Sequence, residues 1–208
     1  GKAYKIFLKR ARKIDNKNII LTPDHIKSLM VELARLNVND VVLDTCTGTG
    51  GFLMEAMEVL IQKANNNETL IKNIKENQLI GFEVDSVLFA LACSNMFLHG
   101  DGRTNLLFRS SLLDDKNENI INNKDQDLLN YINSLKPTKC IINPPYETNS
   151  SIKFTLQALK YLEPNGKLII IMPTPTLTQN QNSFTAEVLK VAKLDFVIRM
   201  PYNLFSEQ

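Results

Sequence analysis

The chain has 208 residues, of which 44% are hydrophobic, and its 24 basic and 22 acidic side chains give a net charge of +2. This length favours one large domain with a sizeable core. The nearly balanced charge gives no sign of a broad nucleic-acid surface, although it is compatible with a local basic patch. The three cysteines are odd in number and lack metal-ligand spacing, so reduced thiols are expected.

Nothing in the sequence predicts a membrane segment or a signal peptide. No stretch is long and apolar enough to cross a membrane. Basic residues are scattered through GKAYKIFLKRARKID at the start of the sequence, which argues against a signal peptide. We therefore predict a cytoplasmic protein with no membrane partner.

Short apolar runs recur along the chain and predict buried strands. In chain order they are residues 41–45 (VVLDT), 79–85 (LIGFEVD), 105–108 (NLLF), 139–143 (KCIIN), 167–173 (KLIIIMP) and 194–199 (LDFVIR).

Segments with apolar residues at helical spacing separate these runs. The helices expected from them lie around residues 26–33, 53–60, 86–98 and 152–162. Two polar insertions, at 63–78 and 114–127, are expected to form surface loops or short exposed helices. The alternation predicts an α/β fold, with a doubly wound, mostly parallel sheet and helices on both faces.

Glycines follow the first expected strand in LDTCTGTGGFL, residues 43–53. They would let the backbone approach a ligand closely, although an ordinary structural turn is the alternative. The dinucleotide fingerprint would need glycine where Leu53 stands, and the P-loop would need a lysine directly after the glycines. The loop is therefore expected to bind a ligand other than a pyrophosphate or a triphosphate.

Two acids stand near the ends of the first two expected strands. Asp44, next to the glycine loop, suggests a ligand with a positive charge or several hydrogen-bond donors. Glu83, near the end of the second strand, could accept hydrogen bonds from two ribose hydroxyls. S-adenosylmethionine, a cationic nucleoside without phosphates, fits both acids.

The fourth expected strand ends in a stiff turn, NPPY, at residues 143–146. A planar NH2 nitrogen is a poor nucleophile because its lone pair is delocalised, and two acceptors aimed at its hydrogens would polarise it. The Asn143 side-chain oxygen and the Pro144 carbonyl could be those acceptors, since Pro145 restricts the turn. Tyr146 offers a ring for a flat substrate. An ordinary Pro-Pro turn is the alternative, and the glycine loop in the same predicted sheet favours the functional interpretation.

Together these motifs resemble those of N6-adenine DNA methyltransferases, in particular the modification (M) subunits of type I restriction-modification systems. The similar segments, in order, are LTPDHIKSLMVEL (21–33), DTCTGTGGFL (44–53), GFEVD (81–85), NPPY (143–146) and VIRMPYNLF (197–205).

The resemblance implies a Rossmann-like fold and transfer of a methyl group from S-adenosylmethionine to the N6 amine of adenine in DNA. It also implies double-stranded DNA as a partner, together with a specificity subunit and a restriction subunit. Residues 1–20 look like the end of a preceding helical region. Residues 21–208 look like the catalytic domain, without the last strand of the fold and without a target-recognition region.

The resemblance also assigns roles to single residues, with no metal among them. The catalytic motif would be Asn143, Pro144, Pro145 and Tyr146, and the base would contact Tyr146 and Phe205. Thr22 and Pro23 also look like an N-cap and a first-turn proline. The implied cofactor-binding residues are Thr22, Pro23, Asp44, Thr45, Cys46, Thr47, Gly48, Gly50, Phe52, Glu83, Val84, Ser111 and Asn143.

The chain departs from the family pattern in two places. Residues 45–47 are Thr-Cys-Thr, where Pro-Ala-Cys is commoner. Where many members place an acid for the adenine of the cofactor, this chain has Ser110 or Ser111, with Asp114 as a possible substitute.

Two other functions stay open on the sequence. Protein glutamine N5-methyltransferases share NPPY and act on another flat NH2 group, although the TPDHI segment and the glycine loop argue against them. A non-catalytic S-adenosylmethionine-binding assembly module is the second alternative, and the intact NPPY disfavours it.

Overall fold

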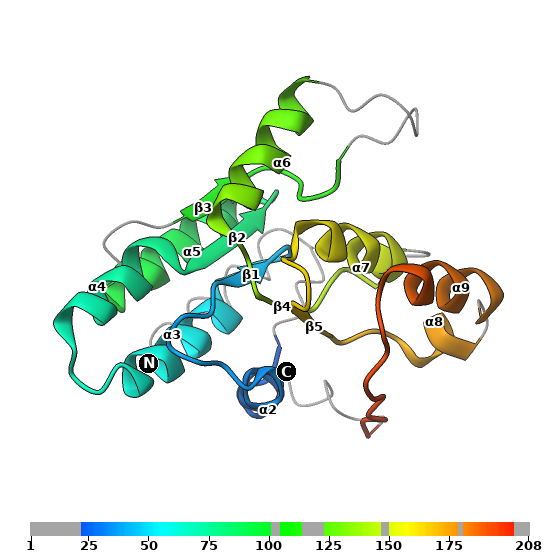
Figure 1. Cartoon of the computed structure of the whole chain (residues 1–208), viewed down its shortest axis with the longest axis horizontal. Helices are drawn as coiled ribbons and strands as arrows, with labels where there is room; N and C mark the ends of the chain where they lie inside the picture. Colours follow the sequence, from blue (N-terminus) through cyan, green and yellow to red (C-terminus); the bar gives the residue numbers. More distant parts are fainter. Residues whose placement is uncertain (1–21, 101–104, 114–122, 147–149, 179–180, 202–208) are drawn as a thin grey trace.

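A computed structural model describes residues 22–100, 105–113, 123–146, 150–178 and 181–201. Its strands form one parallel sheet in the order β3-β2-β1-β4-β5 (Figure 1). The strands are β1 (Val42–Asp44), β2 (Leu79–Glu83), β3 (Asn105–Phe108), β4 (Lys139–Ile142) and β5 (Lys167–Ile170). All five were expected from the apolar runs, and the predicted α/β class with a parallel sheet is confirmed.

The sheet changes direction of growth between β1 and β4. From β1 the chain moves outward through β2 to β3, and it then returns to place β4 on the other side of β1. In open parallel sheets, the crevice at the carboxyl ends of the strands on either side of such a reversal is the usual ligand site. The glycine loop follows β1 and the NPPY turn follows β4, so both border this crevice.

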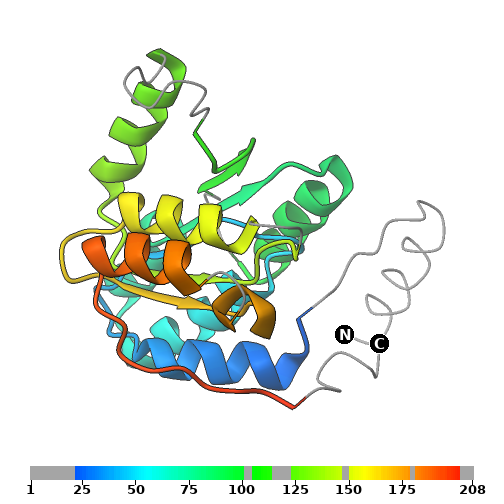
Figure 2. The ribbon, with the colours of Figure 1, turned by 90° about the vertical axis from the view of Figure 1, so that its right-hand side faces the viewer.

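Helices cover both faces of the sheet, as predicted (Figure 2). The first face packs against α2 (Asp24–Ala34), α3 (Gly51–Lys63), α4 (Glu68–Asn77) and α5 (Ser86–Leu98). The second face packs against α6 (Asn123–Leu135) and α7 (Ser150–Tyr161), while α8 (Thr174–Thr178) and α9 (Gln181–Val191) follow β5.

The strand residues alternate between the two cores. Val42 and Leu79 pack on the first face, whereas Leu43 and Ile80 pack on the second. Because successive strand side chains point to opposite faces, a short continuous apolar run contributes side chains to the cores on both faces of the sheet. The polar insertion at 63–78 contains α4, and that at 114–127 includes the start of α6.

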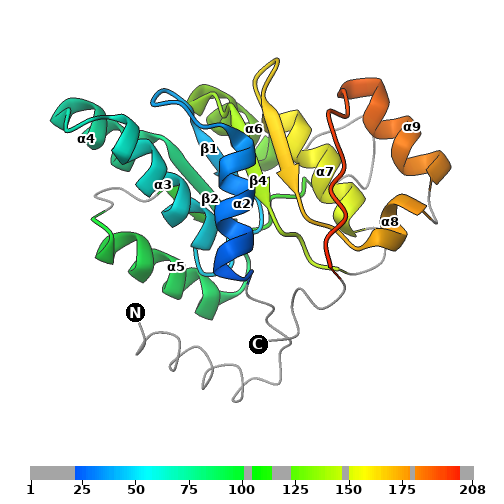
Figure 3. The ribbon, with the colours of Figure 1, turned by 90° about the horizontal axis from the view of Figure 1, so that it is seen from below.

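The prediction of a sixth strand at residues 194–199 is wrong. This segment has no secondary structure, and Leu194, Phe196, Val197 and Ile198 are each about half exposed or more. It runs beside β5 (Figure 3), but a groove lined by both segments lies between them. Without a neighbouring backbone at hydrogen-bonding distance, an apolar run cannot form a ladder, whatever its side chains.

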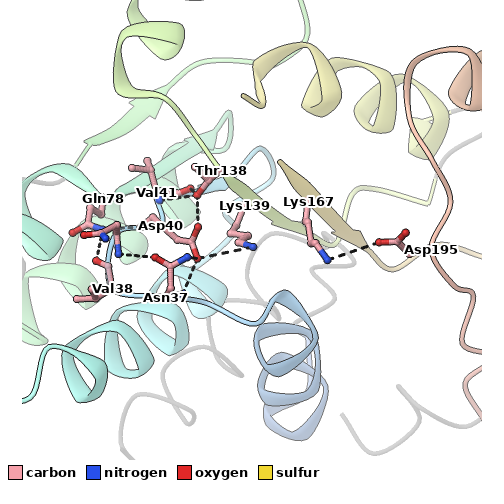
Figure 4. Close-up of polar contacts among 10 residues, drawn as sticks. Asn37, Val38, Asp40, Val41, Gln78, Thr138, Lys139, Lys167 and Asp195 are labelled. Atoms are coloured by element: carbon pink, nitrogen blue, oxygen red, sulfur yellow. Dashed lines mark hydrogen bonds and ion pairs between the residues drawn. The ribbon is translucent and has the colours of Figure 1, made fainter. Parts of the chain in front are cut away.

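A polar network ties the amino ends of the strands together, at the edge opposite the crevice (Figure 4). The buried Asp40 carboxylate accepts hydrogen bonds from the Asn37 backbone and side chain and from the Thr138 hydroxyl, at 2.6–2.7 Å. The buried Gln78 amide donates to the carbonyls of Val38 and Asp40. These bonds join the segments that enter β1, β2 and β4.

Replacing Asp40 with alanine should lower the free energy of unfolding by about 3–5 kcal/mol, because several buried donors lose a charged acceptor. Asp195→Ala is the control. Asp195 is half exposed and pairs with Lys167 at 3.8 Å, so its loss should change the free energy by less than about 0.5 kcal/mol. Urea unfolding of both variants measures the difference, and equal small effects would show that the network does not stabilise the fold.

Candidate active site at the carboxyl ends of β1 and β4

The loop after β1 uses glycines where the backbone is left-handed. Gly48 has φ +57° and Gly50 has φ +86°, values that residues with a Cβ rarely adopt. The turn is held at Thr47, whose backbone N–H donates to the Phe82 carbonyl at 2.9 Å and whose hydroxyl donates to the Asp44 carbonyl at 3.1 Å. The chain then enters α3 at Gly51, so the helix begins at the crevice.

Two residues that the sequence analysis missed support this loop from below. A Cβ on Gly81 would lie 2.4 Å from a Leu106 methyl carbon and 2.5 Å from the Thr47 hydroxyl oxygen, so any larger residue would have to displace side chains that pack beneath the loop. The Asn95 side chain, buried in α5, donates to the Thr49 carbonyl at 2.8 Å. Two features of the sequence could have identified these residues: Gly81 is a glycine inside a strand, and Asn95 is an amide inside a mostly apolar helix.

Asp44 ends β1 with a fully buried carboxyl group. Its Oδ1 accepts the Cys46 N–H at 3.0 Å, but its buried Oδ2 has no hydrogen-bond partner in the described part of the chain. Burial raises the pKa of Asp44 to about 7; the Cys46 bond opposes the rise and the nearby Glu83 charge adds to it. Such a group favours a ligand that brings a donor or a positive charge.

The thiols beside Asp44 are poor candidates for ionised groups. Burial, followed by the Asp44 charge, raises the pKa of Cys46 and of Cys140 well above its usual range. All three cysteines are free, in agreement with the expected reduced thiols. Cys46 therefore brings a neutral side chain to the loop.

Glu83, at the end of β2, is joined to the glycine loop. Its Oε2 accepts the Gly48 N–H at 2.8 Å, and its Oε1 accepts the N–H groups of Val84 and Asp85, each at 2.8 Å. Glu83 therefore ties the end of β2 to the loop after β1. Its expected bonds to a ribose stay a prediction.

Ser111 lies behind the loop with its side chain buried. Its hydroxyl donates to the Thr45 carbonyl at 3.0 Å, and its own carbonyl accepts the Tyr161 hydroxyl at 2.6 Å. The side chain thus supports the loop, and the expected contact with the adenine of the cofactor stays a prediction. Ser110 is exposed, and Asp114 lies outside the described residues.

Asn143 follows β4 and carries the second buried oxygen without a partner. Its Nδ2 donates to the Thr22 hydroxyl oxygen at 3.0 Å, whereas no described residue bonds its Oδ1. Pro144 is buried, and Pro145 and Tyr146 are exposed. The Tyr146 side chain is 37% exposed, and the burial of its remaining surface raises its pKa, while a hydrogen bond with the Asn143 side chain partly offsets this rise. Phe205 lies outside the described residues.

Thr22 does not have the local role expected for it. Pro23, not Thr22, holds the N-cap position of α2, and its carbonyl accepts the N–H groups of Ile26 and Lys27. The expectation that Thr22 caps this helix is therefore wrong. The Thr22 hydroxyl instead meets Asn143, 121 residues away in the sequence.

Asp44 Oδ2 and Asn143 Oδ1 thus end neighbouring strands β1 and β4 as buried acceptors without partners among the residues described. These two acceptors favour a ligand with several hydrogen-bond donors.

Among the residues that the structure describes, no group of three or more His, Cys, Asp or Glu side chains is placed to hold a metal ion. No described helix has the length and apolarity needed to span a membrane.

A family model, N-6 DNA Methylase, matches residues 1–208. The chain belongs to the N-6 DNA methylase family. It is 34% identical over 217 residues to the type II restriction enzyme and methyltransferase RM.BcgI of Heyndrickxia coagulans, covering 99% of this chain and 32% of that protein. It is 23% identical over 220 residues to the type I restriction enzyme HindI methylase subunit of Haemophilus influenzae, covering 99% of this chain and 48% of that subunit. The chain therefore spans about a third of the length of the first relative and about half of the second.

The fold matches that of a solved modification subunit of a putative type I restriction enzyme from Vibrio vulnificus YJ016. The TM-score is 0.70 at 21% identity, over 91% of this chain and 41% of that one. At this identity the match shows the fold. The predicted fold of S-adenosylmethionine-dependent methyltransferases and the predicted resemblance to type I modification subunits are confirmed.

Proposed function

We propose that this chain provides the catalytic site of an adenine-specific DNA methyltransferase in a restriction-modification system. The reaction is transfer of a methyl group from S-adenosylmethionine to the N6 amine of adenine. The observation that carries the proposal is the pair of buried, unpartnered acceptors, Asp44 Oδ2 and Asn143 Oδ1, at the ends of adjacent strands β1 and β4. Family membership supports the class of reaction.

The residues present fit S-adenosylmethionine. Asp44 offers an acceptor and, when ionised, a negative charge to the positive end of the cofactor. The left-handed turns at Gly48 and Gly50 let the loop backbone lie close to it. Glu83, already bound to Gly48, is the acid for the ribose. When bound, the cofactor supplies an electrophilic methyl group.

On the other side of the crevice, the NPPY turn would handle the amine. The Asn143 Oδ1 and the Pro144 carbonyl accept the two N–H groups of N6, which draws the lone pair out of the π-system. The nitrogen would form a bond to the methyl carbon as the bond between that carbon and the cofactor sulfur breaks, with neutral S-adenosylhomocysteine as the leaving group, and the nitrogen would then release a proton to solvent. The exposed ring of Tyr146 stacks on the base. An adenine must leave the duplex to reach this turn, at a cost of a few kcal/mol.

The relatives support a proposal about the partners. The HindI protein is a methylase subunit of a type I enzyme, and RM.BcgI is a type II restriction enzyme and methyltransferase. We therefore propose double-stranded DNA as the partner of the full-length protein, with specificity and restriction functions supplied by other subunits or segments. The division into an N-terminal helical part at 1–20 and a catalytic domain at 21–208, and the cytoplasmic location, belong to the same proposal.

Calorimetry with S-adenosylmethionine tests the placement of the cofactor. The chain should bind it, and replacing Asp44 and Glu83 together by alanine should weaken binding by roughly 100-fold or more, since hydrogen bonds to charged groups are worth about 1.5–3 kcal/mol each. NAD and ATP, whose phosphate-binding motifs are absent, should bind weakly. Asp195→Ala, at a half-exposed position beside β5, is the control. Unchanged affinity in the double variant would rule out this site.

A further inference from the structure

Thr22 makes a contact that links the two motifs farthest apart in the described site. It lies just before α2, and its hydroxyl oxygen accepts a hydrogen bond from Asn143 Nδ2 at 3.0 Å. The helix that follows it packs against β4 and β5. The segment before α2 is thus anchored at the carboxyl end of the strand that carries the NPPY turn.

The hydroxyl is available for this bond because it does not cap the helix. Pro23 holds the N-cap position, and no side-chain cap bond is found at this described helix end. The hydroxyl oxygen of a threonine at the N-cap ordinarily accepts a hydrogen bond from a backbone N–H of the first helical turn. Here the N-cap position falls on Pro23, one residue after Thr22, and the Thr22 oxygen accepts its hydrogen bond from Asn143.

The bond has a consequence for the other end of the amide. A carboxamide is planar, so holding Nδ2 on Thr22 fixes the direction of Oδ1. That oxygen is buried and lacks a partner among the residues seen in the structure. An unpaired buried acceptor is unfavourable, so an arrangement that keeps one must be held by its neighbours.

We propose that Thr22 is a positioning residue that orients the Asn143 amide so that its oxygen, and not its NH2 group, faces the amine of the target. This inference rests on the proposed function. If the amide were flipped, the Asn143 NH2 group would face the NH2 group of the adenine. Both groups are hydrogen-bond donors, so no hydrogen bond would form between them. Thr22 therefore acts on the reaction through Asn143.

The test compares Thr22→Val, which keeps the shape and removes the hydroxyl, with Thr22→Ser, which keeps the hydroxyl. In the full-length protein, Thr22→Val should lower kcat by roughly ten-fold, the worth of one hydrogen bond, with KM for the cofactor changed by less than about three-fold. Thr22→Ser should stay within about two-fold of the parent. An equal loss in cofactor affinity and in kcat would overturn the proposal and make Thr22 a cofactor contact.

A double-mutant cycle separates positioning from general loss of structure. In an Asn143→Ala background, Thr22→Val should cause almost no further loss, since the group it orients is gone. Independent, multiplying losses would overturn the inference.

A measurement without DNA keeps this inference separate from the proposed function. In the chain labelled with 15N-asparagine, the side-chain NH2 signals of Asn143 are those that disappear in Asn143→Ala. Thr22→Val should shift them and speed their exchange with solvent, and Thr22→Ser should not. Unchanged signals in Thr22→Val would overturn the contact, whereas failure of the parent protein to methylate DNA would overturn only the proposed reaction.

Discussion

Asn143→Ala should lower the rate of methyl transfer by roughly 100- to 1000-fold, the usual cost of removing one preorganised transition-state contact. The affinity for S-adenosylmethionine should change by no more than a few-fold, because the oxygen removed is proposed to face the amine of the base. Single-turnover transfer and calorimetry on the full-length protein give the two quantities.

The control for this variant is Asn133→Ala, in which an exposed asparagine on α6, ten residues before Asn143 in the sequence, is truncated in the same way. It should leave both quantities unchanged. A transfer rate for Asn143→Ala within a few-fold of the parent would remove Asn143 from the chemistry.

At pH 8, Asp44→Asn should make the chain more stable and at the same time weaken its binding of the cofactor. Asp44 is buried, and its pKa is raised from 3.8 to about 7. Between these values the folded chain holds a proton that the unfolded chain releases, so Asp44 costs stability as the pH rises from about 4 to above 7. Asparagine keeps an oxygen for the Cys46 N–H and cannot ionise.

The expected gain depends on pH. A difference of about three pKa units corresponds to about 4 kcal/mol at pH 8, and the new buried NH2 group offsets about 1–3 kcal/mol of it. The free energy of unfolding should therefore rise by roughly 1–3 kcal/mol at pH 8 and change little or fall at pH 5. Urea unfolding at both pH values measures this, and a destabilised variant at pH 8 would show that the folded chain supports the ionised carboxylate.

The same carboxyl group should make cofactor binding depend on pH. A positively charged ligand favours ionised Asp44, so affinity should rise between pH 6 and 7.5 as the group, with its pKa near 7, loses its proton. Asp44→Asn has no carboxyl group to titrate at this position. Comparing the pH profiles of the two proteins therefore separates the titration of Asp44 from that of the ligand. A pH profile that is the same in both proteins would mean that Asp44 does not meet the charge.

The strands and the crevice were predictable because they depend on local sequence. Apolar runs such as 105–108 and 139–143 became β3 and β4 within a residue of the expected limits. The order of β1 and β4 then brought the glycine loop and the NPPY turn to one edge. Residues 194–199 had the same local character, but a strand also needs a partner backbone, which a run of side chains does not specify.

The sequence predicted that the motifs after β1, β2 and β4 meet at one edge of the sheet, but it did not predict the contacts that their residues make there. Residue types placed Glu83, Ser111 and Thr22 near a ligand, yet Glu83 bonds the Gly48 N–H, Ser111 bonds the Thr45 carbonyl and Thr22 bonds Asn143. These bonds join segments between 35 and 121 residues apart, so no short pattern encodes them. Helices α6 and α9 were also missed, since α6 begins in a strongly polar stretch and α9 follows the last strand of the sheet.

The most direct test of the proposed function is to incubate the full-length protein with methyl-labelled S-adenosylmethionine and either duplex DNA or a glutamine-containing protein acceptor. Digestion of the DNA to nucleosides then locates the label. The proposed function predicts label in N6-methyladenine, and its loss in Asn143→Ala. Label in the protein acceptor, in cytosine, or in neither substrate despite tight cofactor binding would contradict an adenine-specific DNA methyltransferase.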